Sequence, residues 1–163
     1  MFKIKDIRAL LGENPFFEGM PDEHLQTIAG CGKLVRFKAG DYLLREGEEA
    51  DTFYIVRQGE VAIESDIPAG GPLSIARVGA GGITGYSWLF PPHRNHFDSI
   101  ALTDVSTVAL DGQCLRNKAE NDSALGYQLM KRFAQVVLER LQATRRQMLD
   151  VYANVSFTDH SAD

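Results

Sequence analysis

The sequence predicts a mainly β fold, an antiparallel sandwich or jelly roll that lies between helical ends. About seven short runs of strand-type residues, separated by turn residues, fill the middle of the chain. The last third changes to the spacing of a long helix with apolar faces. The composition, with 44% apolar and 24% charged residues among 163, is that of one globular domain that is large enough to fold without disulfides or a structural metal.

The N-terminal segment, residues 1–33, is predicted to be helical. Pro21 suits the first position of a helix, because its missing N–H is not needed there. The next two residues are acidic, and they favour the positive end of the helix dipole. Either Gly30 or Gly32 is expected to end this helix.

Residues 34–111 are predicted to form the β core. Glycine, proline and aspartate cluster between its apolar runs, at positions typical of turns and loops. Many short strands at such spacing indicate an antiparallel sandwich or jelly roll. The expected strands are 34–37, 42–44, 53–56, 61–64, 73–78, 99–102 and 106–110.

Residues 112–153 are predicted to be helical, and residues 154–163 form a tail. Asp122 suits the N-cap of a long helix, and neither proline nor glycine follows Gly126. A helix that continues to about Tyr152 is roughly 45 Å long, longer than a roll of this size can cover. It is apolar on more than one side, which predicts a homodimer; the alternative is a helix folded back onto its own domain. The expected interface residues are Leu125, Leu129, Phe133, Val136, Val137, Leu141 and Met148.

The net charge of −5 argues against non-specific binding of the whole molecule to nucleic acid or to anionic membranes. Basic residues gather between Cys114 and Tyr152, where solvated helix positions are expected and a nucleic-acid-binding stripe is the alternative. The N-terminus shows neither a signal peptide nor a membrane span. Cys31 and Cys114 are far apart and form no Cys-x-x-Cys pair, so a reduced cytoplasmic location is expected.

No catalytic motif is found in the β core, which predicts a protein that is not an enzyme. The sequence lacks a Gly-x-Ser-x-Gly elbow and a Gly-x-x-x-x-Gly-Lys loop. His93, His96 and Asp98 have the residue types of a metal site on a jelly roll, so a metal-dependent, cupin-like enzyme is an alternative. Because neighbours on one strand face lie two residues apart, ordinary loop histidines are the simpler explanation, and no metal is expected.

The segment of residues 85–90 is a candidate anion site. Gly85 precedes a short apolar stretch, and a one-turn helix there would expose backbone N–H groups. Arg94 is near enough in the sequence to add a guanidinium for a phosphate or carboxylate. The alternative is that Trp88 and its two apolar neighbours fill the core of the roll.

Residues 38–61 resemble the first half of a cyclic-nucleotide-binding domain of the catabolite-activator and Fnr type. This segment has glycines at three turns, the acidic Asp51 and a four-residue apolar strand at the offsets of that family. Similar segments before and after it extend the resemblance over about residues 14–152. The three glycines are Gly40, Gly47 and Gly59.

The resemblance implies a β-roll flanked by helices, with a nucleotide held between the roll and a long dimerisation helix. It also implies a phosphate-binding cassette, in which a glutamate accepts a ribose hydroxyl and an arginine binds the phosphate. Gly85 fits this cassette, but Tyr86 stands in place of the glutamate and Trp88 in place of a small residue. Arg94 lies in the right loop but lacks the Ser/Thr-Ala that follows the family's arginine. These departures imply an altered pocket, and because an unpaired polar group costs about 1–3 kcal/mol, weaker binding of cyclic AMP is expected.

We therefore predict a dimeric, cytoplasmic effector-binding domain with a sensor or regulatory role. The effector is expected to be a cyclic nucleotide similar to cyclic AMP or another small anion, and no cofactor is assigned. A scaffold with a collapsed pocket, acting through an unidentified protein partner, is the alternative. The tail has no room for a recognition helix, so this chain alone is not expected to bind DNA. The candidate ligand-binding residues are Gly85, Tyr86, Ser87, Trp88, Arg94, Asp98 and Ser99.

Overall fold

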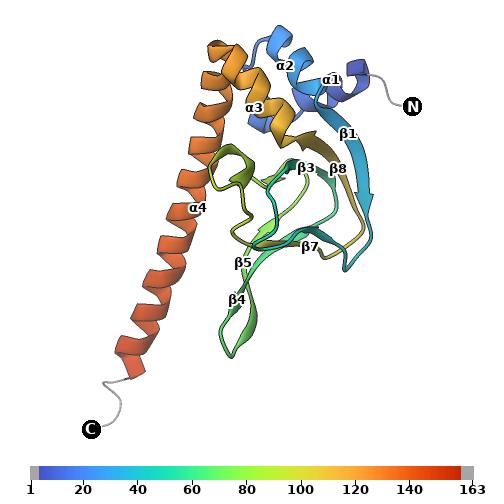
Figure 1. The fold of residues 1–163 in the computed structure, drawn as a ribbon. Coiled ribbons are helices and arrows are strands. Elements are labelled where there is room, and N and C mark those ends of the chain that lie inside the picture. Colours follow the sequence, from blue (N-terminus) through green and yellow to red (C-terminus); the bar gives the residue numbers. More distant parts are fainter. Residues whose placement is uncertain (1–3, 159–163) are drawn as a thin grey trace. The chain divides into compact units, whose positions relative to one another are not determined.

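The computed structural model describes residues 4–158, which divide into two compact units between Leu129 and Met130. The first unit begins with helices α1 (Ile4–Gly12) and α2 (Asp22–Ala29), joined through a short 3-10 helix, η1 (Pro15–Phe17). Figure 1 shows the order of the elements along the chain. The predicted helical N-terminal segment is confirmed within the described residues. Its proline, however, is the N-cap of α2, so the helix begins one residue later than expected.

Two four-stranded antiparallel sheets follow and form the β-roll. One sheet has the strand order β1-β8-β3-β6 and the other has the order β2-β7-β4-β5. The strands are β1 (Gly32–Phe37), β2 (Tyr42–Leu44), β3 (Thr52–Gln58), β4 (Val61–Ile67), β5 (Gly71–Val78), β6 (Ile83–Thr84), β7 (Asp98–Ala101) and β8 (Val105–Asp111). The predicted fold class is confirmed, and the strand that the sequence did not predict is β6, which has two residues.

Apolar side chains from both sheets fill part of the interior of the roll. Successive residues of a strand point to opposite faces, so alternate residues of each strand can face inward. Burying each large aliphatic or aromatic side chain stabilises the fold by about 1.5–3 kcal/mol. The buried members of this core cluster are Leu43, Leu44, Val56, Val61, Ile63, Val78, Phe97, Ala101 and Val105.

Helix α3 (Gly112–Asn121) follows β8 directly, and a disulfide attaches its first turn to the residue that precedes β1. The bond joins Cys31 to Cys114 across a sequence separation of 83, with the two Cα atoms 5.7 Å apart. Our expectation of two distant thiols is therefore wrong. The physical reason is the antiparallel β1–β8 pairing, which places Gly32 opposite Leu110 and so brings the flanking residues together.

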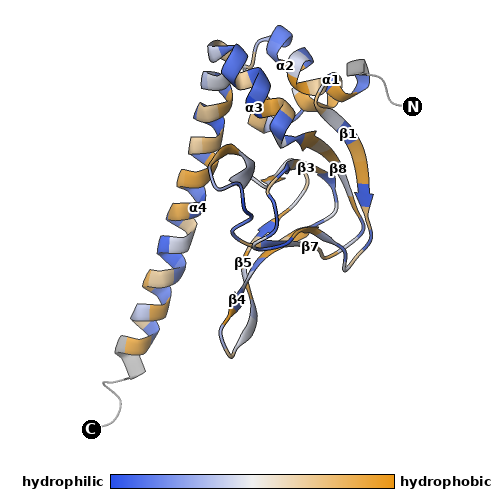
Figure 2. Cartoon of the chain, in the orientation of Figure 1, coloured by the Kyte–Doolittle hydropathy of each residue, from blue (hydrophilic) through white to orange (hydrophobic). Residues whose placement is uncertain are grey.

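Helix α4 (Ser123–Thr158) has 36 residues, or about 54 Å at 1.5 Å per residue. The predicted long helix is confirmed, and it continues six residues beyond the expected end at Tyr152. Figure 2 shows apolar residues along much of its length. Of the seven expected interface residues, Leu125, Leu129 and Phe133 are buried in the single chain, Val136 is half-buried, and Val137, Leu141 and Met148 are exposed. Within residues 4–158, no helix combines the length and the apolarity needed to cross a membrane.

Candidate functional site

A short 3-10 helix, η2 (Ser87–Leu89), follows β6, where the sequence predicted a one-turn helix. Gly85 precedes it with a φ of +87°, in the left-handed region that favours glycine. A Cβ atom on Gly85 would also lie 2.6 Å from the carbonyl oxygen of Thr52. The backbone therefore requires glycine here, because any side chain would collide with the neighbouring strand.

Two side chains of this segment, those of Ser87 and Trp88, are buried in the protein interior. Trp88 is completely buried and Ser87 is 3% exposed. The ring of Tyr86 packs edge-on against Phe97, with 5.6 Å between the ring centroids, and belongs to the periphery of the core cluster. Phe90, by contrast, is 46% exposed. The alternative in which these residues fill the core thus holds for Trp88 and not for Phe90.

Helix α3 contacts η2 through two residues that the sequence did not single out. The backbone N–H of Gly112 donates to the carbonyl oxygen of Asp51 at 2.7 Å. A Cβ atom on Gly112 would lie 2.8 Å from Cβ of Trp88, so the backbone of α3 touches the tryptophan. One turn later, the guanidinium of Arg116 donates to the carbonyl oxygen of Trp88. No sequence motif marks these positions, because the contacts follow from the packing of α3 on the loop.

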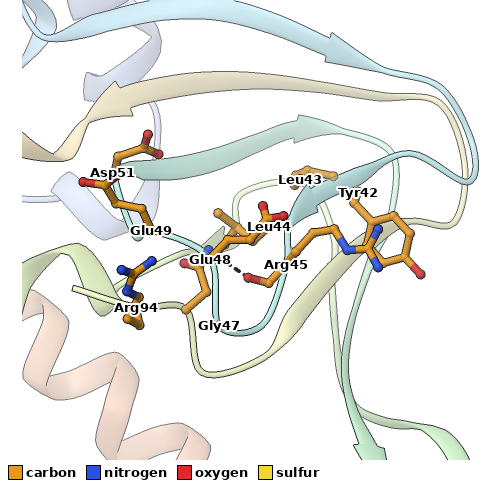
Figure 3. A pocket seen from close by; sticks show the side chains of 10 residues that line it. Tyr42, Leu43, Leu44, Arg45, Gly47, Glu48, Glu49, Asp51 and Arg94 are labelled. Atoms are coloured by element: carbon orange, nitrogen blue, oxygen red, sulfur yellow. Dashed lines mark hydrogen bonds between the residues drawn. The ribbon is translucent and has the colours of Figure 1, made fainter. Parts of the chain in front are cut away.

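Arg94 lines a cleft of about 640 Å³ at the edge of the roll (Figure 3). Its guanidinium has no hydrogen bond or ion pair with any other described residue, and the residue is exposed. Arg94 and Glu49 pair in an isolated antiparallel bridge, which places the two residues opposite each other. The cleft is lined by Tyr42, Leu43, Leu44, Arg45, Gly47, Glu48, Glu49, Asp51, Arg94 and Asn95. It therefore combines cationic groups with carboxylates that can accept hydrogen bonds.

Backbone hydrogen bonds hold the loop that carries these carboxylates. Gly47 donates to the carbonyl oxygen of Asn95 at 2.8 Å, and Asn95 donates back to the carbonyl oxygen of Glu48 at 2.9 Å. Ala50 donates to the carbonyl oxygen of His93 at 2.7 Å. The side chain of Asn95, which is 7% exposed, adds a bond from Nδ2 to the carbonyl oxygen of Arg45 at 3.2 Å. The cleft wall is therefore fixed to the segment that carries Arg94.

Two further candidate ligand-binding residues are engaged in bonds within the protein. Oδ1 of Asp98 accepts a hydrogen bond from the backbone N–H of Glu46 at 2.7 Å. Ser99 is completely buried, and its Oγ lies 2.7 Å from Oγ1 of Thr84. Asp98 and Ser99 are absent from the lining of the cleft, as are residues 85–88. The structure thus places Arg94 with the carboxylates of the loop and apart from these other candidates.

The two loop histidines have separate partners. Nδ1 of His96 lies 2.9 Å from Oγ of Ser87, and Nδ1 of His93 lies 3.2 Å from the carbonyl oxygen of Phe90. Among the residues that the structure describes, no group of three or more histidine, cysteine, aspartate or glutamate side chains could hold a metal ion.

Comparison with known proteins gives a family match over more than half of the chain. Residues 34–122 match the cyclic nucleotide-binding domain. The chain belongs to the cyclic nucleotide-binding domain family. A regulatory subunit of a cAMP-dependent protein kinase from Dictyostelium discoideum is 28% identical over 91% of the chain and 44% of its own length. A CRP-like cAMP-activated global transcriptional regulator from Mycobacterium tuberculosis (strain CDC 1551 / Oshkosh) is 25% identical over 92% of the chain and 63% of its length.

Solved structures agree with this assignment. The N-terminal domain of a transcriptional regulator from Streptomyces coelicolor A3(2) has a TM-score of 0.65 at 28% identity, covering 85% of this chain and 94% of that one. A cyclic nucleotide-binding domain from Methylobacillus flagellatus KT has a TM-score of 0.76 at 22% identity, covering 90% and 83%, and shows the fold alone. The resemblance to the catabolite-activator and Fnr type is thereby confirmed. The chain spans about half the length of the two curated relatives named above.

Proposed function

We propose that this cyclic nucleotide-binding-type domain is a non-enzymatic, cytoplasmic sensor that binds a small anionic effector through Arg94. The observation that carries the proposal is an exposed guanidinium at a cleft, without an ion pair to any described residue. An arginine in this state is available for a phosphate or carboxylate, which it can bind through two parallel hydrogen bonds. A cyclic nucleotide or another small anion fits this chemistry.

The cassette next to Arg94 departs from the family pattern, and this lowers the expected affinity for cyclic AMP. Tyr86 stands where the family has glutamate, and its ring packs on Phe97, so it offers no carboxylate for a ribose hydroxyl. Trp88 is completely buried where the family has a small residue. Glu49 lies opposite Arg94 in the backbone bridge, so its carboxylate can accept hydrogen bonds from hydroxyl groups of an effector bound at the arginine. We infer that the effector has an anionic group and hydroxyl groups.

The exposed apolar residues of α4 support a homodimer as the working form. Val137, Leu141 and Met148 are 40%, 63% and 54% exposed, and large apolar residues exposed in this way favour a protein partner. Leu125, Leu129 and Phe133 are buried within the single chain, so the exposed residues are the ones that a second copy would cover.

A scaffold without an effector remains the second candidate, because one observation favours it. Trp88 has no exposed surface and Tyr86 packs into the core cluster, so the cassette side of the roll is filled by the protein's own side chains. In this case the domain acts through an unidentified protein partner.

A thermal-shift screen distinguishes the sensor from the scaffold. Cyclic AMP, cyclic GMP, inorganic phosphate and dicarboxylates are added to the wild type, to Arg94→Ala and to Arg57→Ala, which replaces an exposed arginine outside the cleft. A ligand at about 100 times its Kd adds about 2.7 kcal/mol, or roughly 5–11 °C for a chain of this size. We expect a shift in the wild type and in Arg57→Ala that is lost in Arg94→Ala. No shift with any anion would favour the scaffold, and an equal shift in all three proteins would refute the role of Arg94.

A further inference from the structure

The disulfide lies where the backbone already holds its two cysteines together. The N–H of Asp111 donates to the carbonyl oxygen of Cys31 at 2.9 Å, and Oδ1 of Asp111 accepts from the N–H of Cys114 at 2.7 Å. The β1–β8 ladder continues from this point with Gly32 opposite Leu110. These bonds do not depend on the sulfur atoms. The two thiols therefore stay close together after reduction, and the bond can open and close again without unfolding the roll.

The two sulfur-bearing residues differ in exposure. Cys31 is 8% exposed, whereas Cys114, in the first turn of α3, is partly exposed. We therefore take Cys114, the more exposed of the two residues, as the site of first attack by a low-molecular-weight thiol. Thiol–disulfide exchange depends on this access, because the attacking thiolate must approach one sulfur directly.

The turn that the disulfide holds is also the turn that contacts η2. Gly112, two residues before Cys114, donates to Asp51 and touches Trp88. Arg116, two residues after it, donates to the carbonyl oxygen of Trp88. Asp51 lines the cleft. The first turn of α3 therefore connects the sulfur atoms directly to η2 and to the wall of the cleft.

We propose that Cys31 and Cys114 form a reversible thiol–disulfide site that controls how firmly the first turn of α3 is held against η2. In the opening reaction, the thiolate of a small thiol attacks Sγ of Cys114, and the Cys31 thiolate leaves. A second small thiol then attacks the outer sulfur of the mixed disulfide, releasing Cys114 as a thiolate and forming a small-molecule disulfide. Each cysteine thiolate takes up one proton. Two electrons pass from the two small thiols to the protein, and closure by a small-molecule disulfide is the reverse.

This site goes beyond the proposed effector binding and adds a second input to the domain. This inference rests on the cytoplasmic location proposed above: disulfides in a reducing compartment are usually transient, catalytic or redox-sensing, so the bond there favours a redox input over a permanent crosslink. Coupling between a modification and a distant site commonly corresponds to a change of about 5- to 150-fold in an equilibrium constant. We expect the equilibrium constant for opening the α3–η2 contact to be about 5- to 150-fold larger in the reduced protein than in the oxidised protein.

The test compares oxidised and reduced wild-type protein without any effector, so its outcome does not depend on the proposed function. Native protein is treated with dithiothreitol, then with oxidised glutathione, and thiols are counted by alkylation and mass spectrometry after each step. Hydrogen exchange is followed in peptides that cover η2 and α3, with the β4–β5 hairpin as the internal reference. The double variant Cys31→Ser, Cys114→Ser provides a protein that cannot form the bond.

We expect no alkylated thiol in the oxidised protein, two after reduction of the folded protein, and none again after oxidised glutathione, without covalent dimers. Exchange in η2 and α3 should be about 5- to 150-fold faster in the reduced protein, with the hairpin unchanged and the double variant insensitive to reductant. A bond that opens only after denaturation would overturn the proposal, as would thiols that never reclose. Equal exchange rates in the two redox states of the wild type would overturn it as well, whether or not the double variant folds.

Discussion

Replacing Gly112 by alanine tests the contact between α3 and η2 directly. An added Cβ atom would lie 2.8 Å from Cβ of Trp88 and 3.0 Å from the carbonyl oxygen of Asp51. Neither neighbour is the free end of a flexible side chain, since one belongs to a completely buried tryptophan and the other to the backbone. Overpacking of this kind costs about 1–3 kcal/mol, and the higher helix propensity of alanine returns about 0.5–1 kcal/mol. These two effects allow a net change of about 0–2.5 kcal/mol, and we expect a loss of about 1–2 kcal/mol in the free energy of unfolding, since neither neighbour can move away easily.

For a chain of this size, such a loss lowers the melting temperature by about 2–8 °C. Thermal unfolding measured by circular dichroism gives this value, and the emission of Trp88, the single tryptophan of the chain, reports on the contact itself. Gly79→Ala is the matched control, because a Cβ atom there meets nothing within 4 Å and should change stability by less than about 0.5 kcal/mol. If Gly112→Ala melts with the wild type and leaves the Trp88 emission unchanged, the close approach of α3 to η2 is refuted.

Three further variants test the α4 interface, a buried tyrosine and the second contact between α3 and η2. Val137→Glu combined with Leu141→Glu places charge on exposed apolar positions of α4 and should convert a dimer into monomers in light scattering. Burial raises the pKa of Tyr54 above 10.0, with repulsion from Asp51 acting in the same direction and a hydrogen bond with Thr52 opposing it. The stabilising contribution of this tyrosine is complete below about pH 10 and is lost as the pH rises through its folded-state pKa, so Tyr54→Phe should flatten the alkaline loss of stability in urea unfolding. Arg116→Ala removes the bond to the η2 carbonyl and should lower the free energy of unfolding by about 1–3 kcal/mol.

Each of these substitutions has a control on the same element or of the same residue type. Gln142→Glu adds charge at an exposed position of α4 and should leave the oligomer intact, so a wild type that is already monomeric at high micromolar concentration would contradict the interface. Tyr127→Phe changes an exposed tyrosine and should keep the alkaline loss. Lys118→Ala truncates an exposed side chain of α3, and equal stability losses in Lys118→Ala and Arg116→Ala would contradict the role of the arginine.

The strands and the long helix could be predicted because their signals are local. The run at residues 42–44 has the predicted bounds, and the other expected strands differ from the observed ones by a few residues at their ends. Strand β6 was missed because its two residues, Ile83 and Thr84, are too few to show any periodicity. Its place in the sheet comes from pairing with β3, which is a tertiary contact.

The contacts around the candidate site are mostly non-local, which limits what the sequence reveals. The disulfide depends on the β1–β8 register and joins residues separated by 83 positions, so spacing alone gave no sign of it. The sequence could suggest Arg94 as a binding residue because it follows the cassette segment. Its position opposite Glu49 depends on a backbone bridge between two loops. Asp98 stays a predicted ligand contact, and the fold adds a bond that the sequence did not reveal, from the N–H of Glu46 to its Oδ1. A sequence identifies the residue types available for binding, while the fold decides which of them are already engaged.

The most direct test of the proposed Arg94-dependent anion site is a calorimetric titration of cyclic AMP into the wild type and Arg94→Ala. Under the proposed function, Tyr86 offers no carboxylate as an acceptor for the nucleotide, and we expect this loss to weaken binding by about 5- to 150-fold relative to a cassette with a glutamate. We predict a wild-type Kd above about 1 μM, equivalent to binding weaker than about −8.2 kcal/mol, and no measurable heat of binding with Arg94→Ala. Sub-micromolar binding to the wild type, or an affinity that Arg94→Ala leaves unchanged, would contradict this assignment.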